Sequence, residues 1–421
     1  MPVPRKSVVW FDDGKRPNVA DLLEKEPGIA FRRLSYDAPS ADNWTALSAA
    51  HVYCVSSTRQ ELPVEYRCDA GLLARCPELL AVSTSGAGYD TVDAAACTAA
   101  GVIVVNQSGA NADAVAEHAL AMMLSLAKNI PQTDRSLRSD RRLSREHFKG
   151  WNARGRTVGL VGIGNTGRRL ARMCGPGLQM KVLACDPYLS AEEIRERGAT
   201  KVDLARLLAE SRFVSIHCPY NDETRSMIGE PELAAMQPGS YLVTTARGGV
   251  VDEHALAAAL RSGHLAGAGV DVWNEEPPPA SHPLLALENV IATHHTAGIT
   301  HDSRENMRTW NAQQVLGILR GERPPRLVNP DAWPRFARRF VEIFGTSPET
   351  AAEARARAAV TRSGVSGARR IRTPVASKKA FATAAGMTRI DGSPAPVGAI
   401  SGWLISTTSI VSGASLMSRI G

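Results

Sequence analysis

The sequence predicts an α/β protein with two doubly wound parallel sheets, followed by a C-terminal tail of low order. Along the first hundred residues, short β-branched runs alternate with helical patterns, which is typical of parallel strands joined by helices. A second series of apolar runs begins at Thr157 and is long enough to form a sheet of its own. After about Gly345 no periodic pattern persists, and such a composition buries too little surface to offset chain entropy.

The elements are expected in the following order. The first series has strands at 8–11, 51–56, 79–85 and 101–106. A long amphipathic helix is expected at 111–130, because apolar residues recur at helical spacing and no Gly or Pro occurs before Pro131; an Arg-rich polar segment, 134–147, follows it. The second series has strands at 157–163, 181–186, 213–219, 240–246, 267–273 and 289–294, and a helix at about 303–319 closes the folded part.

Charge and cysteine content narrow the class of protein. A chain of 421 residues can hold two or three domains. Residues 345–421 carry ten Lys or Arg and three Asp or Glu, so they account for the whole formal charge of +7. The neutral remainder argues against a nucleic-acid partner. Seven cysteines without a CxxC pair indicate reduced thiols in a cytoplasmic protein, with no zinc site. The Ser-, Thr- and Gly-rich stretch 392–418 does not favour a membrane anchor.

A glycine-rich turn indicates a dinucleotide site. Gly162, Gly164 and Gly167 form GxGxxG between a predicted strand and a predicted helix. The pattern alone is weak, but in this context the glycines permit a tight turn, approach of the backbone to a pyrophosphate and close packing of helix and strand. The next strand ends in Asp186, which can accept hydrogen bonds from a ribose 2′-hydroxyl and would repel a 2′-phosphate. The expected cofactor is therefore NAD, although an acid in a surface turn is the alternative reading.

Three further side chains follow strands of the second series. Arg247 follows the strand 240–246, Asp271 and Glu276 follow the next one, and a histidine pair in THHTAG (293–298) follows the last. Oxidation of a 2-hydroxy acid needs a proton acceptor such as His, a carboxylate that orients it, and a guanidinium that holds the substrate carboxylate. No cluster with metal-ligand spacing is present in the sequence.

These motifs resemble the D-isomer-specific 2-hydroxyacid dehydrogenase family, which includes phosphoglycerate dehydrogenases and glyoxylate or hydroxypyruvate reductases. The resemblance covers about residues 45 to 330 and rests on several spaced motifs. They are SGAGYDTVD (85–93), GVIVVNQSGANADAVAEHAL (101–120), GLVGIGNTG (159–167), HCPYNDETR (217–225), ARGGVVDEHAL (246–256), GVDVWNEEP (269–277) and THHTAG (293–298).

The resemblance implies a role for particular residues. Arg247, Glu276 and His295 would be catalytic, and the loop with Gly86, Ala87 and Gly88 would bind the substrate carboxylate together with Arg247; a plain glycine turn is the alternative for this loop. The cofactor would contact Gly162, Gly164, Asn165, Thr166, Gly167, Asp186, Thr245, Ala246, Arg247, Asp271, His295 and Gly298.

The resemblance also implies a domain arrangement. A flavodoxin-like substrate domain, residues 1–108, would be completed by 299–335, and a Rossmann NAD domain would span 109–298. Residues 345–421 would be a basic tail of low order. Members of the family are commonly homodimers in which the helix 111–130 takes part, so a homodimer is expected. The substrate would be a small 2-hydroxy or 2-oxo acid bound between the domains.

Some residues depart from the pattern or have other readings. His294 stands where the family usually has Pro and is interpreted as a tolerated replacement. His118 is expected to be structural, and His217 is expected to act on the cofactor only through its surroundings. One rival function is a formate dehydrogenase of the same fold, which Glu276 opposes. A rival of another class is a dinucleotide-sensing corepressor or scaffold.

Overall fold

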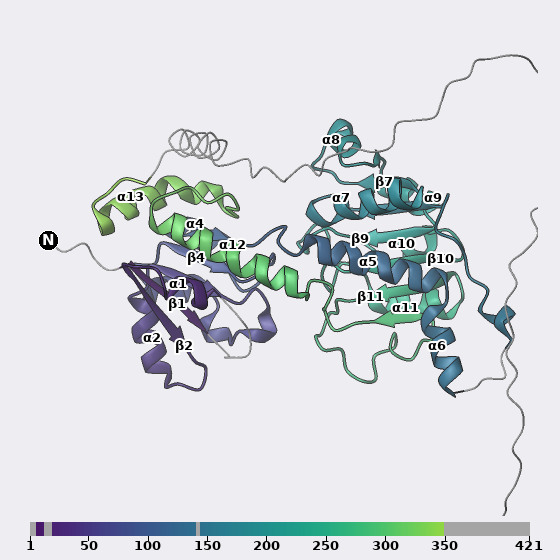
Figure 1. The fold of residues 1–421 in the computed structure, drawn as a ribbon, viewed down its shortest axis with the longest axis horizontal. Helices are drawn as coiled ribbons and strands as arrows, with labels where there is room; N and C mark the ends of the chain where they lie inside the picture. Colours follow the sequence, from purple (N-terminus) through teal and green to yellow (C-terminus); the bar gives the residue numbers. More distant parts are fainter. Residues whose placement is uncertain (1–5, 12–18, 140–143, 349–421) are drawn as a thin grey trace, which may run out of the picture. The chain divides into compact units, whose positions relative to one another are not determined.

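The structure is a computed structural model that describes residues 6–11, 19–139 and 144–348. The chain divides into two units, 1–364 and 365–421, and all described residues belong to the first. Two parallel sheets with helices on their faces form this unit, which confirms the predicted fold class (Figure 1). Apart from residues 345–348, the predicted tail 345–421 lies outside the described residues.

The first sheet has five strands in the order β2-β1-β3-β4-β5, the flavodoxin-like doubly wound order. Its strands are β1 (Lys6–Phe11), β2 (Ile29–Leu34), β3 (Val52–Val55), β4 (Ala81–Thr84) and β5 (Ile103–Val105). Its helices are α1 (Ala20–Leu23), α2 (Ser40–Ser48), α3 (Ala70–Arg75) and α4 (Ala94–Ala100). The sequence analysis missed β2, because this edge strand buries only Leu34 and so lacks a clear apolar pattern.

The second sheet has seven strands in the order β12-β11-β10-β9-β6-β7-β8. Its strands are β6 (Thr157–Val161), β7 (Lys181–Cys185), β8 (Thr200–Lys201), β9 (Phe213–Ile216), β10 (Ser240–Thr244), β11 (Leu265–Val270) and β12 (Val290–Ala292). The chain reverses direction across the sheet at β6, where a Rossmann fold binds its ligand. All six predicted strands are present, and the sequence analysis missed only the two-residue β8, which is exposed.

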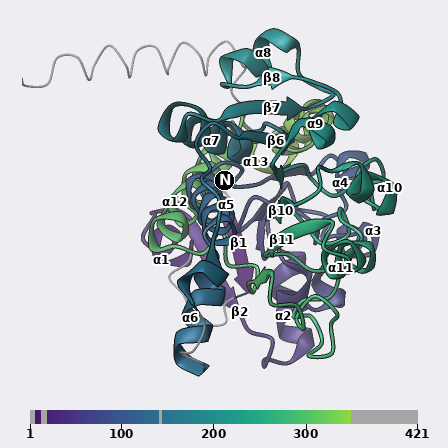
Figure 2. The ribbon, with the colours of Figure 1, turned by 90° about the vertical axis from the view of Figure 1, so that its right-hand side faces the viewer.

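Helices cover both faces of the second sheet. They are α5 (Ala112–Ala127), α6 (Ile130–Ser139), α7 (Asn165–Arg172), α8 (Ala191–Glu196), α9 (Leu204–Glu210), α10 (Glu230–Ala235) and α11 (Glu253–Arg261). Figure 2 shows α5 and α7 on one side of the strands and α9, α10 and α11 on the other. The buried side chains accordingly form two clusters, one under each group of helices.

The helix predicted at 111–130 is shorter than expected, and a second helix follows it. α5 ends at Ala127, because Asn129 takes the left-handed backbone conformation with φ 53°. The second helix, α6, covers the first part of the predicted Arg-rich polar segment 134–147, up to Ser139. No side chain of α6 is buried, and an Asp134–Arg138 pair one turn apart supports it.

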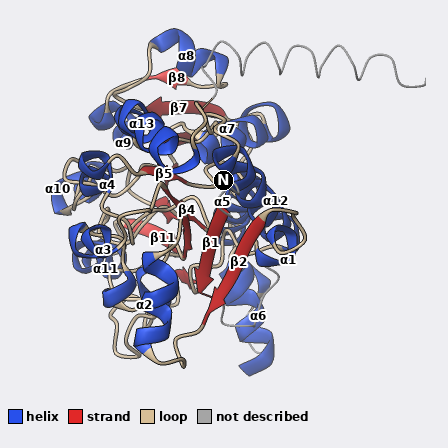
Figure 3. Cartoon of the chain, turned by 90° about the vertical axis from the view of Figure 1, so that its left-hand side faces the viewer, coloured by secondary structure: helices blue, strands red, loops and turns tan. Residues whose placement is uncertain are grey.

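The chain then returns to the first sheet through α12 (His301–Leu319), as predicted, and ends in α13 (Trp333–Phe344), which was not predicted. Figure 3 shows α12 on the opposite side of this sheet from α2. On α13, Phe336, Phe340 and Phe344 recur every four residues and are buried in the same cluster as α12. That spacing is a signal from which the helix could have been predicted.

The packing of α13 gives a testable prediction. Phe336→Ala should lower the free energy of unfolding by about 3–5 kcal/mol, because it removes a fully buried ring and leaves a cavity. Val341→Ala on the exposed side of the same helix is the matched control and should change stability by less than about 0.5 kcal/mol. Urea unfolding of both variants measures the difference. Equal effects would show that α13 does not belong to the core.

Candidate active site

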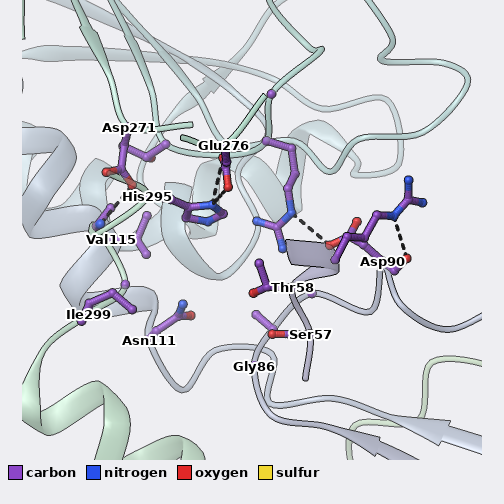
Figure 4. Close-up of a pocket in the computed structure, with 18 of the residues that line it drawn as sticks. Ser57, Thr58, Gly86, Asp90, Asn111, Val115, Asp271, Glu276, His295 and Ile299 are labelled. Atoms are coloured by element: carbon purple, nitrogen blue, oxygen red, sulfur yellow. Dashed lines mark hydrogen bonds and ion pairs between the residues drawn. The ribbon is translucent and has the colours of Figure 1, made fainter. Parts of the chain in front are cut away.

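The carboxyl ends of strands from both sheets border one cleft of about 700 Å³. The second sheet contributes Arg247, Glu276 and His295, and the first contributes the loop with Gly86, Ala87 and Gly88. Figure 4 shows His295 and Glu276 on one side of this space and Gly86 with Ser57 on the other. The structure therefore brings together all the residues predicted to act on the substrate. It also adds Ser57, Asn111 and Tyr220, which the sequence analysis did not single out.

His295 and Glu276 form the central pair of the cleft. The Nδ1 atom of His295 lies 2.9 Å and 3.1 Å from the two carboxylate oxygens of Glu276. Because a carboxylate only accepts, Nδ1 carries the hydrogen and donates it. In the neutral ring, Nε2 then holds the free lone pair. The pair therefore provides a base whose tautomer is fixed by its neighbour.

The loops that carry this pair are tied to each other. Trp273 donates its backbone N–H to Glu276 Oε1 over 3.1 Å, and its indole N–H to the carbonyl of Thr293 over 2.9 Å. On the other side, the Glu253 carboxylate accepts the backbone N–H of Asn274 over 2.7 Å. These bonds fix the loop after β11 to the loop after β12, so the distance between Glu276 and His295 is set by backbone contacts.

The surroundings of Glu276 keep it ionised. Burial opposes ionisation, but the hydrogen bond and charge of His295, the N–H of Trp273 and the charge of Arg247 outweigh it. Together they lower the pKa of Glu276 below its ordinary value. The carboxylate therefore keeps its charge down to a pH below the usual range for Glu, and it accepts the hydrogen of His295 Nδ1 in its charged form.

Arg247 lies against the predicted substrate loop. Its Nε is 3.4 Å from Asp90 Oδ2, and its Nη1 donates to the carbonyl of Ala246 over 2.8 Å. The guanidinium stands directly over Gly88, where a Cβ would meet Nη2 at 2.3 Å. Arg247 and the loop can therefore hold one anion between them. Asp90 lies inside the motif SGAGYDTVD but was not predicted to have a role.

A second part of the cleft, about 570 Å³, borders the glycine-rich turn. Gly162 has φ +86°, which suits only glycine, and a Cβ at Gly167 would meet the carbonyl oxygen of Gly162 at 2.4 Å. A Cβ at Gly164, the N-cap of α7, would meet no atom within 4 Å, and no side chain caps this helix. The first amides of α7 therefore face open space, where a pyrophosphate can bind.

A buried hydroxyl group also supports a bound ligand in this part of the cleft. The Thr245 Oγ1 atom has no hydrogen-bond partner, although it is buried and borders both parts of the cleft. Buried polar atoms are rarely left unpaired, so this one indicates a ligand group. Ala246 and Thr166 also line the second part of the cleft, so the residues present there fit a dinucleotide.

Other residues predicted to touch the cofactor also have partners in the protein. Each carboxylate oxygen of Asp186 accepts one backbone N–H, from Ile163 in the glycine turn over 3.1 Å and from Tyr188 over 3.2 Å. The Asn165 amide donates to the Ser108 hydroxyl over 3.0 Å. Each oxygen of Asp186 keeps a lone pair that could accept a hydrogen bond from a ribose hydroxyl. Its predicted contact with the ribose stays a prediction.

Three histidines complete the site. His118 Nε2 lies 3.3 Å from the Thr293 hydroxyl, on the loop that carries His295, which fits a structural role. His217 borders the second part of the cleft, and burial lowers its pKa to about 4, so it is neutral near pH 7. His294 is exposed and lines the first part of the cleft. Its predicted role as a tolerated replacement stays a prediction.

The described residues contain neither a metal-ligand cluster nor a membrane-spanning helix. In the ranges 6–11, 19–139 and 144–348, no group of three or more His, Cys, Asp or Glu side chains is arranged to hold a metal ion. Within the same ranges, no helix has the length and apolar character needed to cross a membrane.

Comparison with known proteins identifies the family and agrees with the fold. Residues 120–297 match the family model "D-isomer specific 2-hydroxyacid dehydrogenase, NAD binding domain". D-3-phosphoglycerate dehydrogenase of Archaeoglobus fulgidus is 38% identical, over 60% of this chain and 48% of that protein. Glyoxylate reductase of Thermococcus litoralis is 39% identical, over 62% of this chain and 81% of that protein.

A solved structure agrees with these relatives. D-lactate dehydrogenase of Aquifex aeolicus, in complex with NAD and lactic acid, superposes with a TM-score of 0.65 and 27% identity, over 77% of this chain and 99% of that one. The chain thus spans about half of the phosphoglycerate dehydrogenase, with its 48% coverage, but nearly all of the lactate dehydrogenase structure. With its glycine turn and its histidine–glutamate pair, the chain belongs to the D-isomer-specific 2-hydroxyacid dehydrogenase family.

Proposed function

We propose that the protein is an NAD-dependent oxidoreductase that interconverts a small D-2-hydroxy acid and its 2-oxo acid. The observation that carries the proposal is the convergence of His295, Glu276 and Arg247 on a cleft that continues to the glycine turn. Nine residues border both parts of the cleft, so a substrate on Arg247 lies next to a dinucleotide. They are Arg59, Ala87, Gly88, Asp90, Asn111, Val115, Tyr220, Thr245 and Arg247.

Binding would begin with the substrate carboxylate. The backbone N–H groups of residues 86–88 and the guanidinium of Arg247 lie on either side of it. A guanidinium also stabilises the negative charge that develops on the C2 oxygen, because its N–H groups are held in place before the reaction. Substrate binding and polarisation of the carbonyl therefore depend on the same side chain.

His295 would move the proton. In oxidation, Nε2 takes the proton of the C2 hydroxyl while the C2–H bond breaks and a C=O bond forms. Bound NAD supplies the hydride acceptor, so the electron pair of the C2–H bond leaves with the hydride. Glu276 stabilises the protonated ring through Nδ1. In the reverse direction, the protonated His295 returns its proton to the oxygen of the 2-oxo acid.

The relatives leave two substrates as equal candidates, a phosphoglycerate-type acid and glyoxylate or hydroxypyruvate. A panel of glyoxylate, hydroxypyruvate and 3-phosphohydroxypyruvate, followed by NADH absorbance, tests the function. We expect turnover of at least one acid, with NADH preferred over NADPH because Asp186, which contacts the glycine turn through the N–H of Ile163, would repel a 2′-phosphate. Absence of turnover on every 2-oxo acid would favour the alternative, a dinucleotide-sensing corepressor or scaffold, which none of the reported relatives supports.

We also propose that the protein works as a homodimer in the cytoplasm. Ile130 and Leu137, seven residues apart on α6, are exposed large apolar side chains. Residues at that spacing share one face of a helix, and exposed apolar side chains on one face fit contact with another protein. The seven free cysteines, most of them buried, agree with a reducing compartment.

Replacement of the base gives the first prediction for the mechanism. His295→Ala should lower kcat by about 100-fold or more, because the proton then has no acceptor in place. NADH binding, measured by fluorescence, should stay nearly unchanged. His294→Ala is the matched control and should keep most of the turnover. Near-normal turnover of the His295 variant would show that the base has been assigned wrongly.

The charge of Glu276 gives a second prediction. Reduction of a 2-oxo acid needs a proton on His295, and the ionised Glu276 favours that proton. In Glu276→Gln the charge that stabilises the protonated ring is lost, so kcat/KM for reduction should fall by about 10- to 100-fold. Steady-state rates of NADH oxidation measure the loss. An unchanged kcat/KM would separate Glu276 from the proton transfer.

A further inference from the structure

The guanidinium of Arg247 is held on two sides by the protein. Asp90 Oδ2 lies 3.4 Å from Nε, and the carbonyl of Ala246 accepts a hydrogen bond from Nη1 over 2.8 Å. In the described part of the chain, Nη2 has no hydrogen-bond acceptor. Two of the three nitrogens therefore orient the group, and the third keeps N–H bonds that a substrate can use.

The position of Nη2 is made possible by a glycine. A Cβ at Gly88 would lie 2.3 Å from Nη2 and 2.9 Å from Asp90 Oδ2, so neither side chain could stay where it is if residue 88 were larger. The glycine thus lets the guanidinium, the carboxylate and the backbone of the substrate loop meet. Arg247 and the loop with Gly88 consequently border the same cleft.

Asp90 is itself fixed by residues of the first sheet. Arg59 Nε donates to the backbone carbonyl of Asp90 over 2.9 Å, and the hydroxyl of Thr91 donates to the carbonyl of Ser56 over 2.6 Å. Arg247, by contrast, follows a strand of the second sheet. The Asp90–Arg247 pair therefore connects the loop after β4 of the first sheet to the loop after β10 of the second sheet. Figure 4 shows Asp90 at the border of the cleft, on the side opposite Asp271.

We propose that Asp90 is a positioning residue that holds Arg247 in the orientation that binds the substrate carboxylate. The proposal rests on the proposed function, because it concerns the same site. A role in stability explains the pair less well: the side chains are 32% and 36% exposed, and ion pairs at such positions stabilise a fold only slightly. An isolated anion beside a substrate anion would also oppose binding, unless it serves the cation between them.

A double-mutant cycle tests the proposal. Asp90→Asn keeps the size of the side chain and removes its charge, and it should lower kcat/KM for the 2-oxo acid by about 10- to 100-fold, mainly through KM. In a background that already carries Arg247→Ala, the same substitution should have almost no further effect, because Asp90 acts through Arg247. Equal losses in both backgrounds would overturn the proposal.

Two controls separate positioning from folding. Asp93→Asn changes a nearby acid that caps α4 through the N–H of Ala96, and it should leave kcat/KM unchanged. Thermal unfolding of Asp90→Asn should match that of the parent protein within a few degrees. If both Asp variants lowered kcat/KM equally, the loop in general and not the Asp90–Arg247 pair would be responsible.

A final measurement does not depend on turnover. The Nε–H signal of Arg247 in an NMR spectrum, assigned by its loss in Arg247→Lys, should exchange slowly with water in the parent protein and faster in Asp90→Asn. Exchange that is equally fast in both would overturn the proposal. Absence of turnover on every acid would overturn the proposed function alone, because this exchange still decides whether Asp90 holds Arg247.

Discussion

The loop that carries His295 depends on one buried carboxylate at the edge of the cleft, that of Asp271. Asp271 is fully buried, and its oxygens accept the hydroxyl of Thr293 over 2.5 Å and the N–H groups of Thr296 and Ala297 over 2.8 Å and 3.0 Å. These three bonds bend the loop after β12 around the acid. His295, within that loop, is held with φ 52°, a conformation that non-glycine residues adopt only when their surroundings impose it.

The same constraint explains how the reacting groups keep their distances. Burial of a charge is unfavourable unless hydrogen bonds satisfy it, so the loop cannot move away without leaving Asp271 unpaired. Trp273 connects this loop to Glu276. Its indole N–H donates to the carbonyl of Thr293, and its backbone N–H donates to Glu276. Arg247 is held separately, by Asp90 in the loop after β4 and by the carbonyl of Ala246. The base and the cation are thus positioned by different contacts.

The sequence was sufficient to predict which side chains meet at the carboxyl ends of the parallel strands. Arg247, Glu276 and His295 each lie a few residues beyond a strand that apolar runs had located, so their meeting at one edge was predictable. The contacts of Asp271 with its own loop and of Asp90 with Arg247 were not predictable, because a carboxylate after a strand can face a ligand or its own loop. The predicted contact of Asp271 with the cofactor stays a prediction. The break between α5 and α6 was not predicted, because the spacing of apolar residues does not indicate the left-handed backbone conformation of Asn129.

The histidine–glutamate pair also decides between the enzymes that this fold could support. Oxidation of formate releases a hydride and leaves carbon dioxide, so no hydroxyl proton has to be removed. An ionised acid that fixes the tautomer of His295 with both oxygens would then have no function, and its burial would only be unfavourable. For a 2-hydroxy acid, the same acid stabilises the imidazolium that every turnover creates. The pair therefore favours the proposed reaction of a 2-hydroxy acid over oxidation of formate.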